Sequence, residues 1–86
     1  MLKIWAKAMI KDKIVKDLMY RRYEKYDPEK FMEYLVEICH EFDYPTPVVL
    51  KSHTKNFAAF NITRFKSSDF VEPIDFDALV LENASD

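Results

Sequence analysis

The chain has 86 residues, of which 49% are hydrophobic and 33% are charged, and its net charge is −2. This composition is typical of one small globular domain and excludes a disordered chain, which would hold fewer apolar residues. Glycine is absent, which excludes the glycine-rich loops that bind phosphates and the nucleophile elbow of many hydrolases. We expect a single compact domain over residues 1–86, with a frayed tail over residues 83–86.

The same composition bears on the compartment. All apolar runs are short, so no segment approaches the ~20 residues that a membrane-spanning helix needs. Lys3 and Lys7 interrupt the region where a secretory signal would be apolar. A single cysteine, Cys39, cannot form an internal disulfide and agrees with a reducing compartment. We therefore expect a cytoplasmic protein without membrane contact.

The first predicted element is a strand over residues 2–10, where side chains alternate with the period of two that a half-buried strand shows. The outward face of this strand is made by Lys3, Trp5, Lys7 and Met9. The pattern is interrupted at residues 11–13, and a run of mixed β-branched and large residues follows over residues 14–20. This arrangement predicts a β-hairpin that turns near Asp12, with the turn type left open.

One long amphipathic helix is predicted to begin at Asp27 and Pro28. Asp27 can accept hydrogen bonds from the first free N–H groups, and Pro28 suits the first helical position. Apolar residues then recur at the spacing of one helix face: Phe31, Tyr34, Leu35, Ile38, Cys39 and Phe42. Two prolines within residues 43–47 end this helix.

The next elements are shorter. Residues 48–50 are apolar and β-branched, which predicts a short buried strand. A second, short helix is predicted over residues 53–60, with Ser52 as its cap and with Phe57 and Phe60 on its inner side. Residues 61–65 favour neither helix nor strand.

The last strand is predicted after Pro73, where side chains alternate again. Its outward face is expected to consist of Asp75, Asp77, Leu79 and Leu81. The resulting order ββαβ(α)β predicts an α+β fold. We expect a small, mostly antiparallel sheet of three or four strands, with the long helix and the second short helix packed against it.

Charge is polarised along the chain. Residues 1–30 hold nine basic and five acidic side chains, whereas residues 66–86 hold one and six. If the first and last strands are neighbours, Lys3 and Lys7 lie beside Asp75 and Asp77, and opposite charges help to set the register.

The alternative is a basic, aromatic patch that binds single-stranded nucleic acid through stacking and phosphate contacts. Its members would be Lys3, Trp5, Lys7, Lys16, Tyr20, Arg21, Arg22, Tyr23 and Tyr26. The acidic net charge of the whole chain favours the paired arrangement over this patch.

Catalytic chemistry finds the least support. Glu37, His40 and Glu41 share one helix face, but di-iron bundles need such groups from several helices. His53 is tied to no second group by a motif. We assign no catalytic, cofactor-binding or metal-ligating residue, and an enzyme or metal site around His40 or His53 is the least favoured hypothesis.

Four segments together carry a family resemblance: KIWAK, KDKIVKD, LVEICHEFDYPTPVVL and FVEPIDFDALVLE. They resemble a family of small uncharacterised proteins from anaerobic Gram-positive bacteria. The resemblance covers most of the chain through hydrophobic and acidic positions. It implies a compact cytoplasmic domain of unknown function, and it transfers no functional residue to this chain.

The favoured hypothesis is a non-enzymatic domain that binds a protein partner, or a second copy of itself, through the outward face of the sheet. Its apolar groups would be Trp5, Met9, Leu79 and Leu81, more than an isolated monomer is expected to expose. Its charged groups would be Lys3, Lys7, Asp75 and Asp77. A segment within residues 61–70 that covered this face would leave no such surface.

Overall fold

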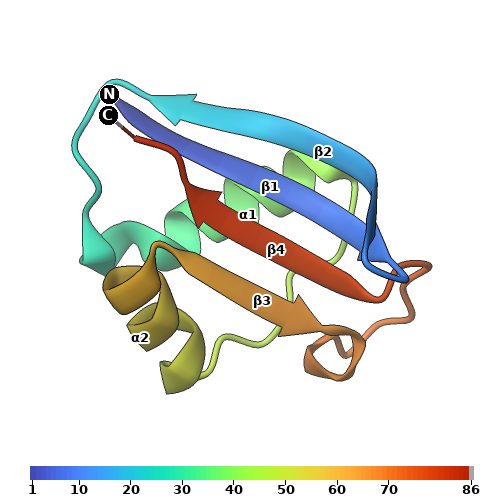
Figure 1. Ribbon diagram of the computed structural model, residues 1–86. Helices are drawn as coiled ribbons and strands as arrows, with labels where there is room; N and C mark the ends of the chain where they lie inside the picture. The colour runs from blue at the N-terminus through green and yellow to red at the C-terminus, as the bar shows by residue number, and fades with distance from the viewer. Residues whose placement is uncertain (86) are drawn as a thin grey trace.

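A computed structural model describes residues 1–85 and shows an α+β fold with one four-stranded antiparallel sheet. The elements are β1 (Leu2–Ile10), β2 (Lys13–Arg22), α1 (Phe31–Phe42), α2 (Lys51–Phe60), β3 (Ile62–Lys66) and β4 (Ala78–Asn83). The strand order is β2-β1-β4-β3, which confirms that the first and last strands are neighbours. In Figure 1, α1 lies behind the sheet, while the face toward the viewer carries no helix.

The hairpin between β1 and β2 turns at Lys11 and Asp12, as predicted. Both residues have a positive φ, 49° and 64°. Two left-handed residues define a type I′ turn, which matches the twist of a hairpin but usually contains Asn and Gly. The Lys11 N–H donates to Oδ2 of Asp77 at 2.8 Å, so a distant loop helps to hold a turn that has no glycine.

Replacing Asp12 with glycine should therefore stabilise the protein. A left-handed residue that carries a β-carbon costs roughly 1–2 kcal/mol, and glycine returns part of that gain through its greater freedom in the unfolded chain. We expect Asp12→Gly to raise the free energy of unfolding by about 0.5–1 kcal/mol in urea denaturation. Lys13→Gly, one residue into the strand, is the control and should destabilise. A neutral or destabilising Asp12→Gly would contradict this account of the turn.

The entry to α1 follows the predicted capping. Oδ1 of Asp27 accepts the N–H of Glu29 at 3.0 Å, which begins a 3-10 turn, η1 (Pro28–Lys30), that leads into α1. All the apolar residues predicted for the inner face are buried: Phe31, Tyr34, Leu35, Ile38, Cys39 and Phe42. They form one core with the inner face of the sheet, where Ile4 and Leu81 are fully buried. The helix prediction is therefore confirmed.

The middle of the chain differs from the prediction, because the element order is ββααββ and not ββαβ(α)β. Residues 48–50 form a loop, and both Val48 and Leu50 are about half exposed. We predicted a strand because these residues are apolar. A run this short is stable as a strand only when it pairs with another strand, and residues 48–50 do not. Residues 62–66 form β3 instead, where buried Thr63 and Phe65 alternate with exposed residues.

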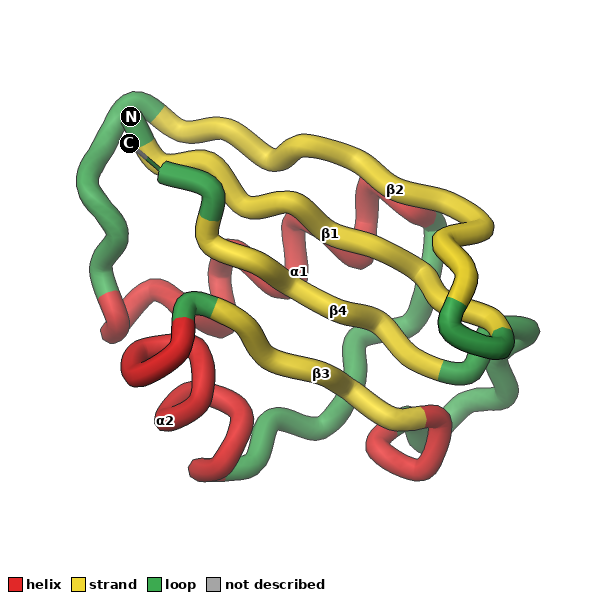
Figure 2. The backbone as a smooth tube through the Cα atoms, viewed as in Figure 1, coloured by secondary structure: helices red, strands yellow, loops and turns green. Residues whose placement is uncertain are grey.

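The end of the chain is tied to β1. The Ala84 N–H donates to the carbonyl of Lys3 at 2.8 Å, and the Lys3 N–H donates to Oγ of Ser85 at 3.0 Å. Figure 2 shows the segment after β4 beside the start of β1, at one corner of the sheet. Residues 84 and 85 are therefore hydrogen-bonded to β1 in this structure. Fraying of residues 83–86 stays a prediction, and Asp86 lies outside the described residues. No helix within residues 1–85 is long and apolar enough to cross a membrane.

Candidate functional site

The centre of the outer sheet face is occupied by what we call the Trp5 cluster: Trp5, Lys7, Asp17 and Glu82. Nζ of Lys7 lies 4.0 Å from the centre of the Trp5 ring and 3.0 Å from Oε1 of Glu82. Nε1 of Trp5 donates to Oδ2 of Asp17 at 2.8 Å. Lys7 is only 9% exposed. Because the members satisfy one another, the cluster stabilises the sheet and leaves few polar groups free for a ligand.

The lysines of β1 do not meet the acidic residues that the charge pattern indicated. Lys7 pairs with Glu82, whereas Asp75 and Asp77 lie in the loop before β4. The Asp77 N–H donates to the carbonyl of Met9 at 2.8 Å, beside the hairpin turn. The antiparallel register explains the correction, because the start of β4 faces the end of β1, while Val80 and Glu82 lie opposite Lys7 and Trp5.

Leu79 and Leu81 lie on the face opposite Trp5, so their predicted place on the outer surface is wrong. Both are fully buried against the helices, and the outer side of β4 is formed by Ala78, Val80 and Glu82. Ala78 and Val80 are buried as well, because β4 is a central strand. A strand that is buried on both sides shows no polar alternation, so its phase is hidden in the sequence.

The residues of the predicted nucleic-acid patch are spread over different parts of the structure. Tyr20 is buried, and Nζ of Lys16 lies 5.5 Å from the ring centre of Tyr44. Arg22 forms ion pairs with three carboxylates: Glu24, Glu33 and Glu37. Tyr26 packs against the core aromatics Tyr34 and Phe57. Lys16, Tyr20, Arg22 and Tyr26 therefore lie apart from the other members of the predicted patch, of which Lys3, Trp5, Lys7 and Arg21 share the outer face of the sheet.

The two candidate histidines have different surroundings, because His53 lines the second hollow described below and His40 does not. Nδ1 of His53 accepts the N–H of Leu50 at 2.8 Å, so the proton lies on Nε2, which faces Oδ2 of Asp69 at 3.3 Å. The ring is 6% exposed, and its two nitrogens join the start of α2 to the turn after β3. His40 is exposed on α1. Among the described residues, no three or more His, Cys, Asp and Glu side chains are grouped to hold a metal ion.

Cys39 is a core residue, as its position on the apolar helix face predicted. It is a free cysteine with no exposed surface. Burial raises the pKa of its thiol to about 11. A thiol that stays protonated is a poor nucleophile, so Cys39 contributes packing and not chemistry.

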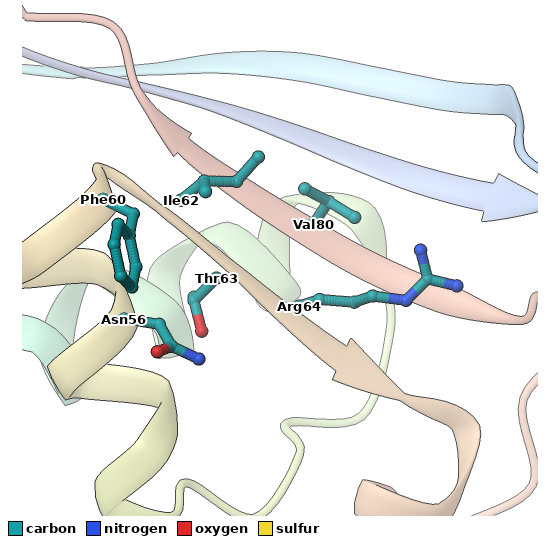
Figure 3. Close-up of a pocket in the computed structure, with 6 residues that line it drawn as sticks. All are labelled: Asn56, Phe60, Ile62, Thr63, Arg64 and Val80. Atoms are coloured by element: carbon teal, nitrogen blue, oxygen red, sulfur yellow. The ribbon is translucent and has the colours of Figure 1, made fainter.

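An open groove lies between α2 and β3, and Figure 3 shows its apolar half. This half is a hollow of about 380 Å³ lined by Asn56, Phe60, Ile62, Thr63, Arg64 and Val80. A second hollow, of about 330 Å³, shares Asn56 and Arg64 with the first and continues to Lys66 and Asp69. We call the two hollows together the α2–β3 groove.

Large apolar side chains are exposed in this groove. Phe60 is 70% exposed and Ile62 is 39% exposed. The prediction that Phe60 faces inward with Phe57 is wrong: Phe57 is buried, but Phe60 is the last residue of α2 and lies at the rim of the groove. The Thr63 hydroxyl is buried without a hydrogen-bond partner in the described structure, and it points toward Asn56 in Figure 3.

Sequence reasoning missed this groove because it assigned no element to residues 61–65. The sequence did contain a sign of a strand here, because Thr63 and Phe65 alternate with polar or β-branched neighbours. No family model, curated protein or solved structure matches this chain. The resemblance to small proteins of anaerobic Gram-positive bacteria therefore stays a prediction, and functional inference depends on the geometry of the groove.

Proposed function

We propose that this protein is a small non-enzymatic interaction domain that binds a protein partner, or a second copy of itself, at the α2–β3 groove. The observation that carries the proposal is the joint exposure of Phe60 and Ile62 beside a strand edge that no other strand within residues 1–85 covers. Exposed apolar side chains with a polar rim are typical of protein interaction sites.

The proposed interaction surface lies at the β3 edge of the sheet, whereas the sequence predicted it at the centre of the outer sheet face. Leu79 and Leu81 are in the core, and Trp5 is held by Lys7 and Asp17. The groove instead combines apolar side chains with an exposed cation, Arg64, at the point where the outer sheet face meets α2. A partner there would cover apolar surface without breaking any ion pair of the Trp5 cluster.

The test compares a groove variant with an equally conservative change elsewhere. The groove variant is Phe60→Asn with Ile62→Thr, and the control is Val71→Asn, because Val71 is 88% exposed and does not line the groove. Light scattering over a concentration range measures self-association, and cross-linking in cell extract measures capture of a partner. We expect the groove variant to lose association by about tenfold or more, while the control keeps it.

Two results would contradict the proposal: a partner that the groove variant retains, or a monomer that captures no protein at all. Circular dichroism should first establish that α2 is intact in the groove variant. Salt-dependent binding of a mixed single-stranded oligonucleotide, without protein capture, would favour a nucleic-acid ligand in place of a protein.

A further inference from the structure

We infer that the α2–β3 groove binds an extended, acidic segment of a partner protein, which adds to the sheet as a new strand beside β3. This inference rests on the proposed function and specifies how the partner binds. The inference depends on three neighbouring features: an unpaired strand edge, a helix alongside it, and two cations that have no ion-pair partner among the described residues.

The backbone of β3 has hydrogen-bonding groups on the side away from β4. The Asn83 N–H donates to the carbonyl of Asn61, and the Ser67 N–H donates to the carbonyl of Asp77. In this antiparallel register, the odd-numbered residues of β3 bond to β4. Ile62 and Arg64 therefore direct their N–H and C=O groups away from β4, and these groups have no backbone partner in the described part of the chain. The edge offers a template for one more strand.

Helix α2 leaves space for a ligand beside this edge. Ser52, Asn56 and Phe60 recur every four residues along α2 and line the groove from end to end. The helix therefore runs along the edge without closing it. A groove between a helix and a free strand edge is the site in which peptide-recognition domains add an extended ligand, with side-chain pockets for alternate residues of that ligand.

The groove is positively charged along β3. Arg64 and Lys66 are exposed, and neither side chain has an ion-pair partner among residues 1–85. Asp69, the one acidic residue among the described residues that line the groove, already accepts the Lys66 N–H at 2.8 Å and faces His53. An added strand would place alternate side chains opposite Arg64 on the outer face, where a carboxylate is favoured. Its other side chains would face Phe60 and Thr63, where apolar or small residues fit.

A second copy of the chain is disfavoured as the occupant of the groove. Pairing β3 with β3 of another molecule would gather Arg64 and Lys66 of both copies along one edge. Like charges on paired strands are destabilising, and cations on an edge strand normally oppose unspecific pairing. The same cations favour an acidic strand, so the edge selects its partner by charge.

The test begins with random ten-residue peptides displayed on phage and selected on the full-length protein. The recovered peptides are synthesised, and their affinity is measured by fluorescence anisotropy. We expect them to carry Asp or Glu at alternate positions. Arg64→Gln should weaken binding by about threefold to tenfold, and Arg64→Pro, which also removes an outward N–H, by about a further tenfold. Val71→Asn should leave binding unchanged.

A second measurement does not depend on folding of the variants. Methylating the peptide amides at alternate positions should abolish binding in one set and spare it in the other, because only alternate N–H groups of an added strand face β3. Recovery of basic peptides, equal tolerance of both methylated sets, or recovery of no peptide would overturn strand addition. Loss of a protein partner by the Phe60→Asn, Ile62→Thr variant would still support the proposed function in that case, so the two failures are distinguishable.

Discussion

Leu79→Ala is expected to lower the free energy of unfolding by about 2–5 kcal/mol. Leu79 is fully buried in a central strand and belongs to the core that α1 and the inner sheet face form together. Alanine removes apolar contacts and leaves a cavity that the flanking strands cannot fill without breaking the sheet register. Urea denaturation followed by circular dichroism measures the loss, and an unchanged slope would show that the unfolded state is unaffected.

The control for this prediction is Ile62→Ala, on the outer side of the neighbouring strand. Ile62 is 39% exposed, so its replacement should cost no more than about 1 kcal/mol. If Leu79→Ala and Ile62→Ala were equally mild, Leu79 would lie on an exposed face, as the alternation in the sequence suggested. A much larger loss of stability for Leu79→Ala would support the structure, in which Leu79 lies on the core face of β4.

His53→Leu is expected to destabilise the protein by about 2–3 kcal/mol. The variant loses the acceptor for the Leu50 N–H at the start of α2, a type of loss that costs about 0.5–2 kcal/mol. It also loses the contact between Nε2 and Oδ2 of Asp69, an oxygen that still accepts the Lys66 N–H, and one such polar interaction contributes about 0.5–1.5 kcal/mol. Thermal unfolding of the purified variant measures the sum.

His40→Leu provides the comparison, because His40 is exposed on α1 and its loss should change stability by about 0.5 kcal/mol or less. His53→Asn should recover part of the stability lost by His53→Leu, since an amide oxygen can accept the same N–H group. Equal effects of His53→Leu and His40→Leu would contradict the capping role. That result would return His53 to the set of candidate functional residues.

Elements with strong local signals were predictable. The inner face of α1 was recognised because six apolar residues follow the helical period, and its start because Asp27 and Pro28 have local capping roles. The hairpin was recognised because an alternating run precedes Asp12 and a run of mixed β-branched and large residues follows it. Each of these signals spans a few neighbouring residues, so no knowledge of distant contacts was needed.

The candidate site was not predictable in the same way. Of the outward residues assigned from the sequence, Lys3, Trp5, Lys7 and Met9 lie on the outer face of β1, while Leu79 and Leu81 do not. The alternation of β4 is hidden because central strands are buried on both sides. The α2–β3 groove combines the end of a helix with the edge of a strand that has only five residues. A run that short carries a weak pattern.

The sequence by itself determined which residues form the core face of the helix and which residues of β1 point outward, because the periods of helices and strands are local properties of the chain. Only the tertiary structure decided that Lys7 pairs with Glu82, that Leu79 is buried, and that Phe60 lies beside a free strand edge. Those outcomes depend on strand order and register. Both are set by contacts between segments more than 60 residues apart, such as β1 with β4, which no short stretch of sequence encodes.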